Sequence, residues 1–188
     1  MGQMRLLLIS GSTRDASTNT AALRTLAAVA PPGVTAELYS GLMALPAFTP
    51  DADDDAPHPA VADLRAAIAT ADAVIFCTPE YAGALPGSLK NLLDWTVGTG
   101  DLYGRPAAWI NVAAPGRGAG ACAELATVLR YVTVDLITEA CADIPIARDA
   151  IGADGLVEDP HIRAALTAAL HAVAAHLQAR RSETNSIP

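Results

Sequence analysis

The sequence predicts an α/β fold in which helices cover both faces of a parallel sheet. Short apolar runs alternate with segments whose apolar residues recur at helical spacing, which is the pattern of repeated strand–helix units. One run, from Pro106 to Ala113, is almost continuously apolar, as expected for a strand buried on both faces. Because crossovers of this length are right-handed, we expect a doubly wound, five-stranded sheet in the order 2-1-3-4-5.

The first two strands are each followed by a predicted helix. Arg5 to Ser10 is an apolar run that ends at glycine, and Thr18 to Ala30 then carries small and apolar residues at helical spacing. A second strand is predicted from Val34 to Tyr39. A loop rich in proline and aspartate follows it and leads to a helix from Ala60 to Ala71.

The centre of the sheet is predicted to be a strand from Ala73 to Thr78. The helix expected after it, from Pro86 to Val97, has its leucines on one side and polar residues elsewhere. The simplest interpretation of this helix packs the leucines on the sheet. It leaves Lys90 and Trp95 in water.

The last third of the chain completes the predicted architecture. After the fourth strand we expect a helix from about Ala121 to Thr133, a fifth strand near Glu139 to Asp143, and a helix from Pro160 to Arg180. No internal repeat or linker interrupts this order. We therefore expect one domain over residues 1–181 and a flexible tail over residues 182–188.

Composition limits the partners that the chain can have. Its 188 residues are 52% hydrophobic, which is enough to bury a substantial core. The 12 Lys and Arg against 20 Asp and Glu give a formal charge of −8, which repels a polyphosphate backbone, so we expect no nucleic-acid partner. The apolar runs are too short for a signal peptide or a membrane span. A cytoplasmic protein with no membrane contact is the expectation.

Residues that commonly bind metals do not form a metal-site pattern in this sequence. Cys77, Cys122 and Cys141 are an odd count without CxxC spacing, which predicts reduced core residues. The four histidines lack an HExxH pattern and are expected at the surface. The acidic run at residues 51–55 lacks the turn glycine and terminal glutamate of a calcium loop, so we interpret it as a solvated loop. We expect no metal site.

The turn after the first strand is rich in groups that bind phosphate. It offers the side chains of Ser12, Arg14, Ser17, Thr18, Asn19 and Thr20 beside the unpaired backbone N–H groups of a helix start. Charge-assisted hydrogen bonds contribute about 1.5–3 kcal/mol each, against about 0.3–1 kcal/mol for the helix dipole, so Arg14 and the hydroxyls should dominate. Helix capping by Ser17 or Thr18 is the alternative, but it does not explain the arginine. The turn has neither a GK[ST] ending nor a GxGxxG pattern.

Two further turns have features that suit a flat ligand. In the turn after the third strand, prolines stiffen the backbone, a tyrosine can rest against a ring, and backbone N–H groups can bond ring atoms. The residues expected to face the ligand there are Pro79, Glu80, Tyr81, Ala82 and Gly83. The turn over residues 114–120 holds Pro115, Gly116 and Gly118, and glycine lets a backbone approach a ligand closely. Ordinary strand-to-helix loops are the alternative for both turns.

The motifs together resemble the NADPH-dependent FMN reductase family of flavodoxin-like proteins, which includes chromate, quinone and azo-dye reductases. The resemblance covers about Arg5 to Arg130. It is carried by Gly11-Ser12-Thr13-Arg14 with Ser17 and Asn19, by Pro79-Glu80-Tyr81, by Pro86-Gly87-Ser88-Leu89-Lys90-Asn91, and by Asp94-Trp95. It implies bound FMN and a ping-pong reaction. A reduced nicotinamide, NADPH or NADH, passes hydride to the flavin, which then reduces a quinone, azo compound, metal oxyanion or free flavin.

The resemblance also implies roles for individual residues. The six side chains of the first turn would hold the FMN phosphate, the residues from Pro79 to Gly83 would border the isoalloxazine, and Pro115, Gly116 and Gly118 would complete the site. No side chain need be catalytic, because the flavin performs the redox step. The family usually has asparagine where this chain has Ala82, which affects the hydrogen bonding of that loop. Relatives commonly assemble through the helix after the second turn, so a homodimer or homotetramer is expected.

Two other functions remain open at this level. One is an FMN-binding electron carrier that never meets nicotinamide, although flavodoxins usually carry a TxTGxT loop where this chain has Arg14. The other is a flavin-free regulatory or binding protein, which Ala82 makes conceivable. The sequence assigns no residue that separates NADPH from NADH, and it does not identify the acceptor.

Overall fold

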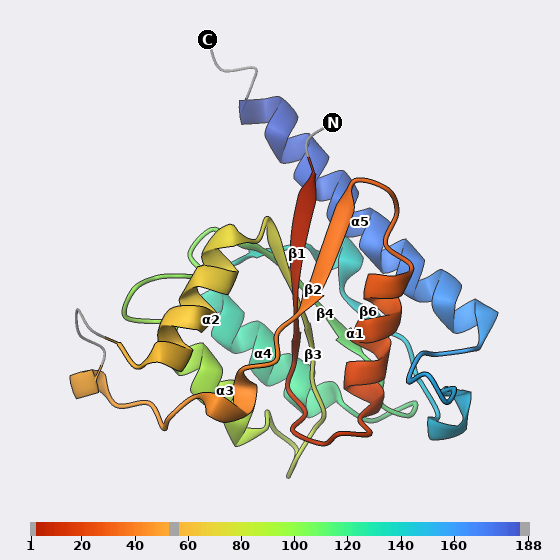
Figure 1. The fold of residues 1–188 in the computed structure, drawn as a ribbon, viewed down its shortest axis with the longest axis horizontal. Coiled ribbons are helices and arrows are strands. Elements are labelled where there is room, and N and C mark those ends of the chain that lie inside the picture. The colour runs from red at the N-terminus through yellow and green to blue at the C-terminus, as the bar shows by residue number, and fades with distance from the viewer. Residues whose placement is uncertain (1–2, 53–56, 185–188) are drawn as a thin grey trace.

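The computed structural model describes residues 3–52 and 57–184, and it confirms the doubly wound parallel sheet. The strands follow the order β2-β1-β3-β4-β5, every pairing is parallel, and a further short strand, β6, also pairs with β4 (Figure 1). The strands are β1 (Met4–Ser10), β2 (Val34–Leu38), β3 (Ala73–Cys77), β4 (Pro106–Asn111), β5 (Asp135–Leu136) and β6 (Ala142–Asp143).

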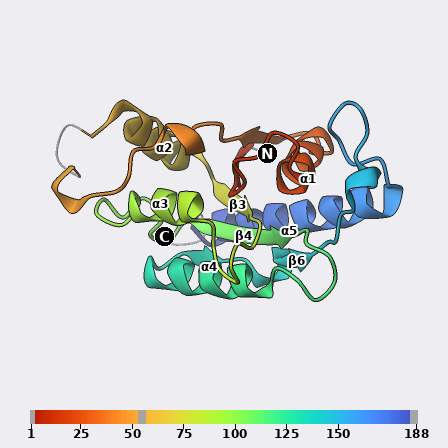
Figure 2. The same ribbon diagram turned by 90° about the horizontal axis from the view of Figure 1, so that it is seen from below.

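Five α-helices of the described chain cover the two faces of the sheet. They are α1 (Thr18–Ala28), α2 (Pro59–Thr70), α3 (Gly87–Asp94), α4 (Ala119–Tyr131) and α5 (Pro160–Thr184). Seen from below, α1 and α5 lie on one side of the strands and α2, α3 and α4 on the other (Figure 2). Successive side chains of a strand point to opposite faces, so Leu6 and Leu8 join the α1–α5 core while Leu7 and Ile9 join the other.

The fifth strand differs from the prediction. A strand over Glu139–Asp143 was expected, but a 3-10 helix occupies Thr138–Ala140 and divides the edge into β5 and β6. Both pieces pair with β4, β5 near its start and β6 at its end. The interruption buries Ile137 and Ala140 in the core, which a straight edge strand with alternating faces would not do.

The helix α3 also corrects an expectation. It ends at Asp94, and Trp95 is fully buried instead of lying in water. The indole Nε1 of Trp95 and the amide of Asn91 both donate to the carbonyl oxygen of Pro46, each at 2.9 Å, and the ring of Phe48 packs edge-on against Trp95. The long loop after β2 is therefore anchored on α3. Lys90 is exposed, as expected, and its Nζ lies 2.5 Å from the Asp94 carboxylate.

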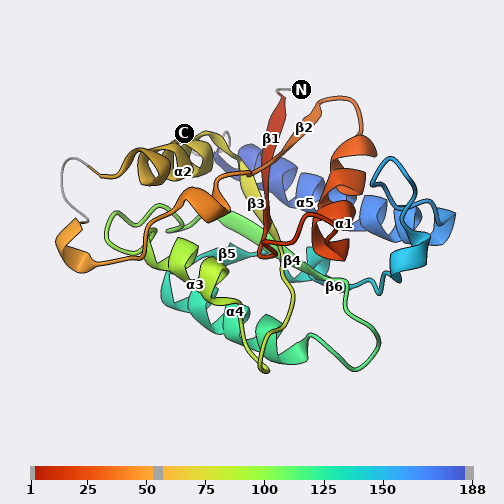
Figure 3. The same ribbon diagram turned by 60° about the horizontal axis from the view of Figure 1, so that its bottom comes forward.

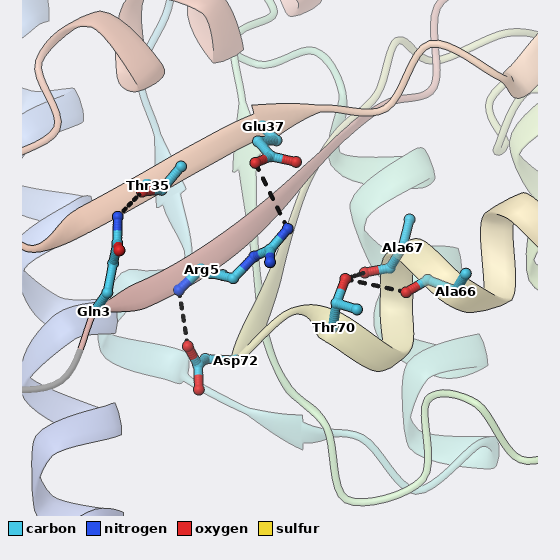
Figure 4. A network of polar contacts seen from close by, with 8 residues as sticks. All are labelled: Gln3, Arg5, Thr35, Glu37, Ala66, Ala67, Thr70 and Asp72. Carbon is cyan, nitrogen blue, oxygen red and sulfur yellow. Dashed lines mark hydrogen bonds and ion pairs between the residues drawn. The ribbon is translucent and has the colours of Figure 1, made fainter.

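Polar contacts tie the elements together at the amino edge of the sheet. The backbone N–H of Arg5 donates to the Asp72 carboxylate at 2.8 Å, and the Arg5 guanidinium lies 3.7 Å from Glu37 (Figure 4). Figure 4 also shows Gln3 bonded to Thr35, and Thr70 bonded to Ala66 and Ala67. Arg181 of α5 reaches the same Asp72 at 3.0 Å. These contacts close the edge opposite to the three predicted ligand turns.

Two predicted segments, the C-terminal tail and the acidic run, lie partly outside the residues that the structure describes. The helix α5 continues to Thr184, so residues 182–184 are helical instead of a tail, and residues 185–188 lie outside the described chain. The acidic run extends over residues 53–55, which also lie outside it, whereas Asp51 is exposed in a short 3-10 helix. None of the described helices is both long and apolar enough to cross a bilayer.

Candidate functional site

The three predicted ligand turns meet at the carboxyl edge of the sheet. Figure 3 brings this edge forward, with the turns after β1, β3 and β4 facing the reader. A cavity of about 220 Å³, here called the edge cavity, receives residues from all three turns. Its lining is Thr18, Asn19, Thr78, Pro79, Glu80, Val112, Ala113, Arg117 and Gly118. In an open α/β sheet this is where ligands bind.

The first turn is anchored to the end of the neighbouring strand β3 where it leaves β1. The N–H of Gly11 donates to the carbonyl of Cys77 at 2.9 Å. A Cβ at Gly11 would collide with the side chain of Thr78 and would crowd Leu89, so only glycine fits where the turn leaves β1. The close approach places the phosphate-type turn directly beside the end of β3.

Four side chains of the first turn remain available for a ligand: Ser12, Arg14, Ser17 and Thr18, the last of which lines the edge cavity. Ser17 is the N-cap residue of α1, yet its side chain makes no capping hydrogen bond, so capping does not account for this serine. Its exposed fraction is only 7%, so its hydroxyl is held in a nearly closed setting. Arg14 is exposed and forms no ion pair with another described residue. The Oγ of Ser12 accepts from the N–H of Arg14 at 3.3 Å, which shapes the turn.

Asn19 and Thr20, predicted as phosphate ligands, are engaged within the protein. The Cys77 thiol donates to the Oδ1 of Asn19 at 3.3 Å, and the hydroxyls of Thr20 and Ser10 are hydrogen-bonded at 2.9 Å. Asn19 still lines the edge cavity, so its amide nitrogen remains a donor there, but Thr20 does not line it. Burial raises the pKa of the Cys77 thiol, which keeps it a neutral donor that fixes the start of α1.

The cysteines follow the prediction with one difference. All three are free thiols, and Cys77 and Cys122 are buried, whereas Cys141 is only partly buried. Burial raises the pKa of Cys122 to about 11, and nearby Asp143 acts in the same direction. A thiol in this state is a poor nucleophile at neutral pH.

Glu80 of the second turn has a role that sequence reasoning missed. Its Oε2 accepts from the N–H groups of Gly120 at 2.7 Å and Ala121 at 3.2 Å, so the carboxylate caps the start of α4. A Cβ at Gly120 would collide with the carbonyl of Gly83. The second and third turns are therefore locked against each other, and Glu80 lines the edge cavity as part of that lock.

Tyr81, Ala82 and Gly83 form a tight turn at the rim. Tyr81 and Ala84 exchange two backbone hydrogen bonds, at 3.0 and 3.1 Å. The two residues between them have positive φ, +53° at Ala82 and +78° at Gly83, which is the pattern of a type I′ turn. All three residues are exposed and stand outside the lining of the edge cavity, with Tyr81 47% exposed.

The third turn is divided between two cavities. Gly118 lines the edge cavity, with φ of +84°, and a Cβ there would collide with the side chain of Asn111. Pro115 and Gly116 instead line a neighbouring cavity of about 480 Å³. Arg117 lines both, and it is the charged residue that the sequence interpretation passed over in a turn otherwise made of small residues. Thr78, Val112 and Ala113 were also missed, because each lies at or just past a strand end that was assigned to the sheet.

Comparisons with known proteins identify relatives over most of the chain. Residues 4–142 match the family described as NADPH-dependent FMN reductase. The chain is similar to an NAD(P)H-dependent FMN reductase of Pseudomonas aeruginosa, with 33% identity over 90% of this chain and 93% of the relative. It is also similar to a 2-hydroxy-1,4-benzoquinone reductase of Burkholderia, with 30% identity over 95% and 98%. Among solved structures, the flavoenzyme NAD(P)H:acceptor oxidoreductase FerB from Paracoccus denitrificans superposes with a TM-score of 0.78. The two sequences are 30% identical over 92% of this chain and 98% of FerB.

Proposed function

This chain belongs to the NADPH-dependent FMN reductase family, and from that premise we propose that its edge cavity holds FMN and that it reduces small acceptors with NAD(P)H. The observation that carries the proposal is the meeting of three turns around one cavity. Thr18 and Asn19 at the start of α1 line that cavity on one side, and residues of the two rigid glycine turns line it on the other. The unused N-cap hydroxyl of Ser17 directly precedes Thr18 in the first turn.

The first turn fits the phosphate end of FMN. The Ser17 hydroxyl is not used by its own helix, and Arg14 has no competing carboxylate among the described residues. We assign Ser12, Arg14, Ser17, Thr18 and Asn19 to the phosphate. Thr20 acts indirectly, because its hydroxyl is hydrogen-bonded to that of Ser10. Charge-assisted bonds of about 1.5–3 kcal/mol each make Arg14 the largest single contributor.

The second and third turns fit the ring end. Pro79 and Glu80 form one wall, Arg117 and Gly118 the other, and the contact of Gly120 with Gly83 keeps the walls at a fixed separation. When bound, FMN supplies the hydride chemistry itself, and the protein supplies position and charge. Glu80 is held by two backbone N–H groups, so we assign it an orienting role and no role in proton transfer. Ala82 and Gly83 contribute backbone at the rim.

The turn Tyr81–Gly83 at the rim and the activities of the relatives together support one class of electron acceptor. The two relatives are an FMN reductase and a benzoquinone reductase, and Tyr81, which follows Glu80 of the cavity lining in the sequence, has an exposed ring. A flat aromatic acceptor can rest on such a ring. We therefore favour a quinone as the acceptor over the azo compounds, metal oxyanions and free flavin that the family also reduces.

Assembly and location belong to the same proposal. A mostly apolar groove of about 470 Å³ between α3 and α4, lined by Leu85, Lys90, Ala123, Glu124, Thr127 and Val128, supports a homodimer or homotetramer. Sedimentation that finds monomer alone at working concentration would contradict this. The three free thiols and the dependence on NAD(P)H support a cytoplasmic location.

The decisive experiment uses colour. The purified protein should be yellow, and anaerobic NADPH or NADH should bleach it. An electron carrier would stay yellow under the same treatment, and a flavin-free binding protein would remain colourless even with added FMN. Either result would overturn the assignment.

A variant then tests the phosphate end of the site. Arg14→Ala, purified without added flavin, should retain less FMN per protein than the wild type. Arg130→Ala removes the same charge from the last turn of α4 and serves as the control. Full flavin content in Arg14→Ala would show that the first turn does not bind the phosphate as proposed.

A further inference from the structure

A second cavity lies beside the first turn, on the other side of the start of α1. It measures about 260 Å³ and forms between α1 and the segment 148–155 that precedes α5. Ser17 lines this cavity and the next residue, Thr18, lines the edge cavity, so the two cavities are neighbours. The FMN assignment uses Ser17 at the near side of this cavity but no residue of its far wall, which lies beyond residue 142, where the match to the family ends.

Two arginines from distant parts of the chain face this second cavity. Arg24 comes from α1 and Arg148 from a short 3-10 helix, and both are exposed. Neither guanidinium forms an ion pair or a hydrogen bond with any residue that the structure describes. Asp15 also lines the cavity, so its side chains carry a net charge of +1 in a protein whose formal charge is −8.

Hydrogen bonds fix the far wall of the second cavity, the segment before α5, against α1. The buried N–H of Val157 donates to the Thr25 hydroxyl at 2.9 Å, and that hydroxyl donates to the carbonyl of Ala21, so the segment is tied to α1. Within it, the N–H of Gly152 bonds the carbonyl of Leu156 at 2.8 Å. These bonds hold Arg148 opposite α1.

Gly155 brings the far wall of the second cavity close to Arg24. A Cβ at Gly155, where φ is +78°, would lie 3.5 Å from the Nη1 of Arg24, so the backbone there runs alongside the guanidinium. Asp154 does not compete for either arginine, because its carboxylate accepts from the N–H of Leu156 at 3.0 Å.

We propose that Arg24 and Arg148 form a subsite for a phosphate monoester, and that its source is the 2′-phosphate of NADPH. This inference rests on the proposed function, and it adds the preference between the two nicotinamides. NADPH differs from NADH by one dianionic group, and a guanidinium pair facing a small cavity is suited to bind such a group. FMN carries a single phosphate, which is assigned to the first turn, so Arg24 and Arg148 are available to a second ligand.

The direct test measures binding to the FMN-loaded protein by calorimetry, without any redox reaction. The probes are adenosine 2′,5′-bisphosphate, adenosine 5′-monophosphate and inorganic phosphate. The bisphosphate should bind at least about tenfold more tightly than the other two, and Arg24→Gln or Arg148→Gln should each remove about that factor, equivalent to about 1.4 kcal/mol. Arg130→Gln, which loses the same charge at the opposite edge, should bind like the wild type. Equal binding of the three probes would overturn the proposal.

Kinetics supplies the second readout. Arg24→Gln and Arg148→Gln should raise the KM for NADPH relative to that for NADH, whereas Asp15→Asn should lower it, because the carboxylate repels the phosphate. An unchanged ratio in both arginine variants refutes the subsite and leaves the proposed reductase intact. Binding of the bisphosphate that depends on the arginines, in a protein that oxidises neither nicotinamide, would instead refute the reductase and keep the subsite.

Discussion

Replacing Ala82 tests what the tight turn at the rim requires. Ala82 has a φ of +53°, in a region where the Cβ of an L-residue approaches the following carbonyl oxygen. That conformation costs a residue with a Cβ about 1–2 kcal/mol. Asparagine tolerates it better, and glycine removes the clash at an entropic cost of about 0.4–1 kcal/mol in the unfolded chain. We expect Ala82→Asn and Ala82→Gly each to raise the free energy of unfolding by about 0.5–1 kcal/mol.

Thermal unfolding of the FMN-free protein measures this directly. In a domain of this size, 1 kcal/mol moves the midpoint by about 2–4 °C, so each variant should melt about 1–4 °C higher. Ala82→Val should melt lower, because a β-branched residue fits this φ worst. Ala47→Asn makes the same chemical change at an exposed loop residue without positive φ and should have no effect. A lower midpoint in both Ala82→Asn and Ala82→Gly would refute the reasoning.

The same pair of variants separates two ways in which an asparagine at position 82 could act. If asparagine acts by ordering the turn, Ala82→Gly and Ala82→Asn should improve FMN affinity alike, because both stabilise the same backbone. If its side chain contacts the flavin, only Ala82→Asn should improve affinity. The conformation at Ala82 favours the first explanation, since Gly83 also has positive φ and the Asn-Gly pair is the preferred centre of a type I′ turn.

Two further predictions concern charges that hold the elements together. Glu80→Gln keeps an acceptor but removes the negative charge at the start of α4, and it should lower the free energy of unfolding by about 0.3–1 kcal/mol in urea titrations. Asp135→Asn should destabilise the protein at pH 7 but not in acid. Although burial would raise the pKa of Asp135, His176 and Arg180 outweigh it and hold that pKa below its usual value, so its contribution is lost as pH falls below about 3.9. Unfolding curves at pH 7 and pH 3 with the same difference between variant and wild type would contradict the second prediction.

The sheet could be predicted because its signal is local. Each central strand is a short apolar run between turn residues, and each helix repeats its apolar residues along its own length, so both patterns are visible without the rest of the chain. The prediction of a strand over Glu139–Asp143 was wrong at Thr138–Ala140, because an edge strand has one partner and its hydrophobic pattern in the sequence is weak. Its local shape is set by burial of Ile137 and Ala140 in the α1–α5 core.

The site could be predicted only in part, because the residues that form it come from turns far apart in the sequence. The phosphate-type turn is a local motif, and Thr18 and Asn19 of that turn line the edge cavity. The phosphate role of Ser12, Arg14 and Ser17, which are not in that lining, stays a prediction. Glu80 was expected to face a ring, but it accepts from the N–H of Gly120, 40 residues later in the first turn of α4, and no local pattern reports that contact.

The arrangement of charge at the carboxyl edge explains how an acidic protein can attract anionic ligands. Three acidic side chains near this edge accept hydrogen bonds from donors of the protein: Glu80 from the start of α4, Asp143 from Asn111, and Asp159 from the start of α5. The arginines of the two cavities, by contrast, form no ion pairs within the described chain. At physiological salt the Debye length is about 8 Å, so a bound phosphate interacts with these arginines while most of the remaining acidic surface is screened. The formal charge of −8 therefore does not exclude FMN or NADPH from the edge, because arginines line both cavities, although Asp15 also lines one of them.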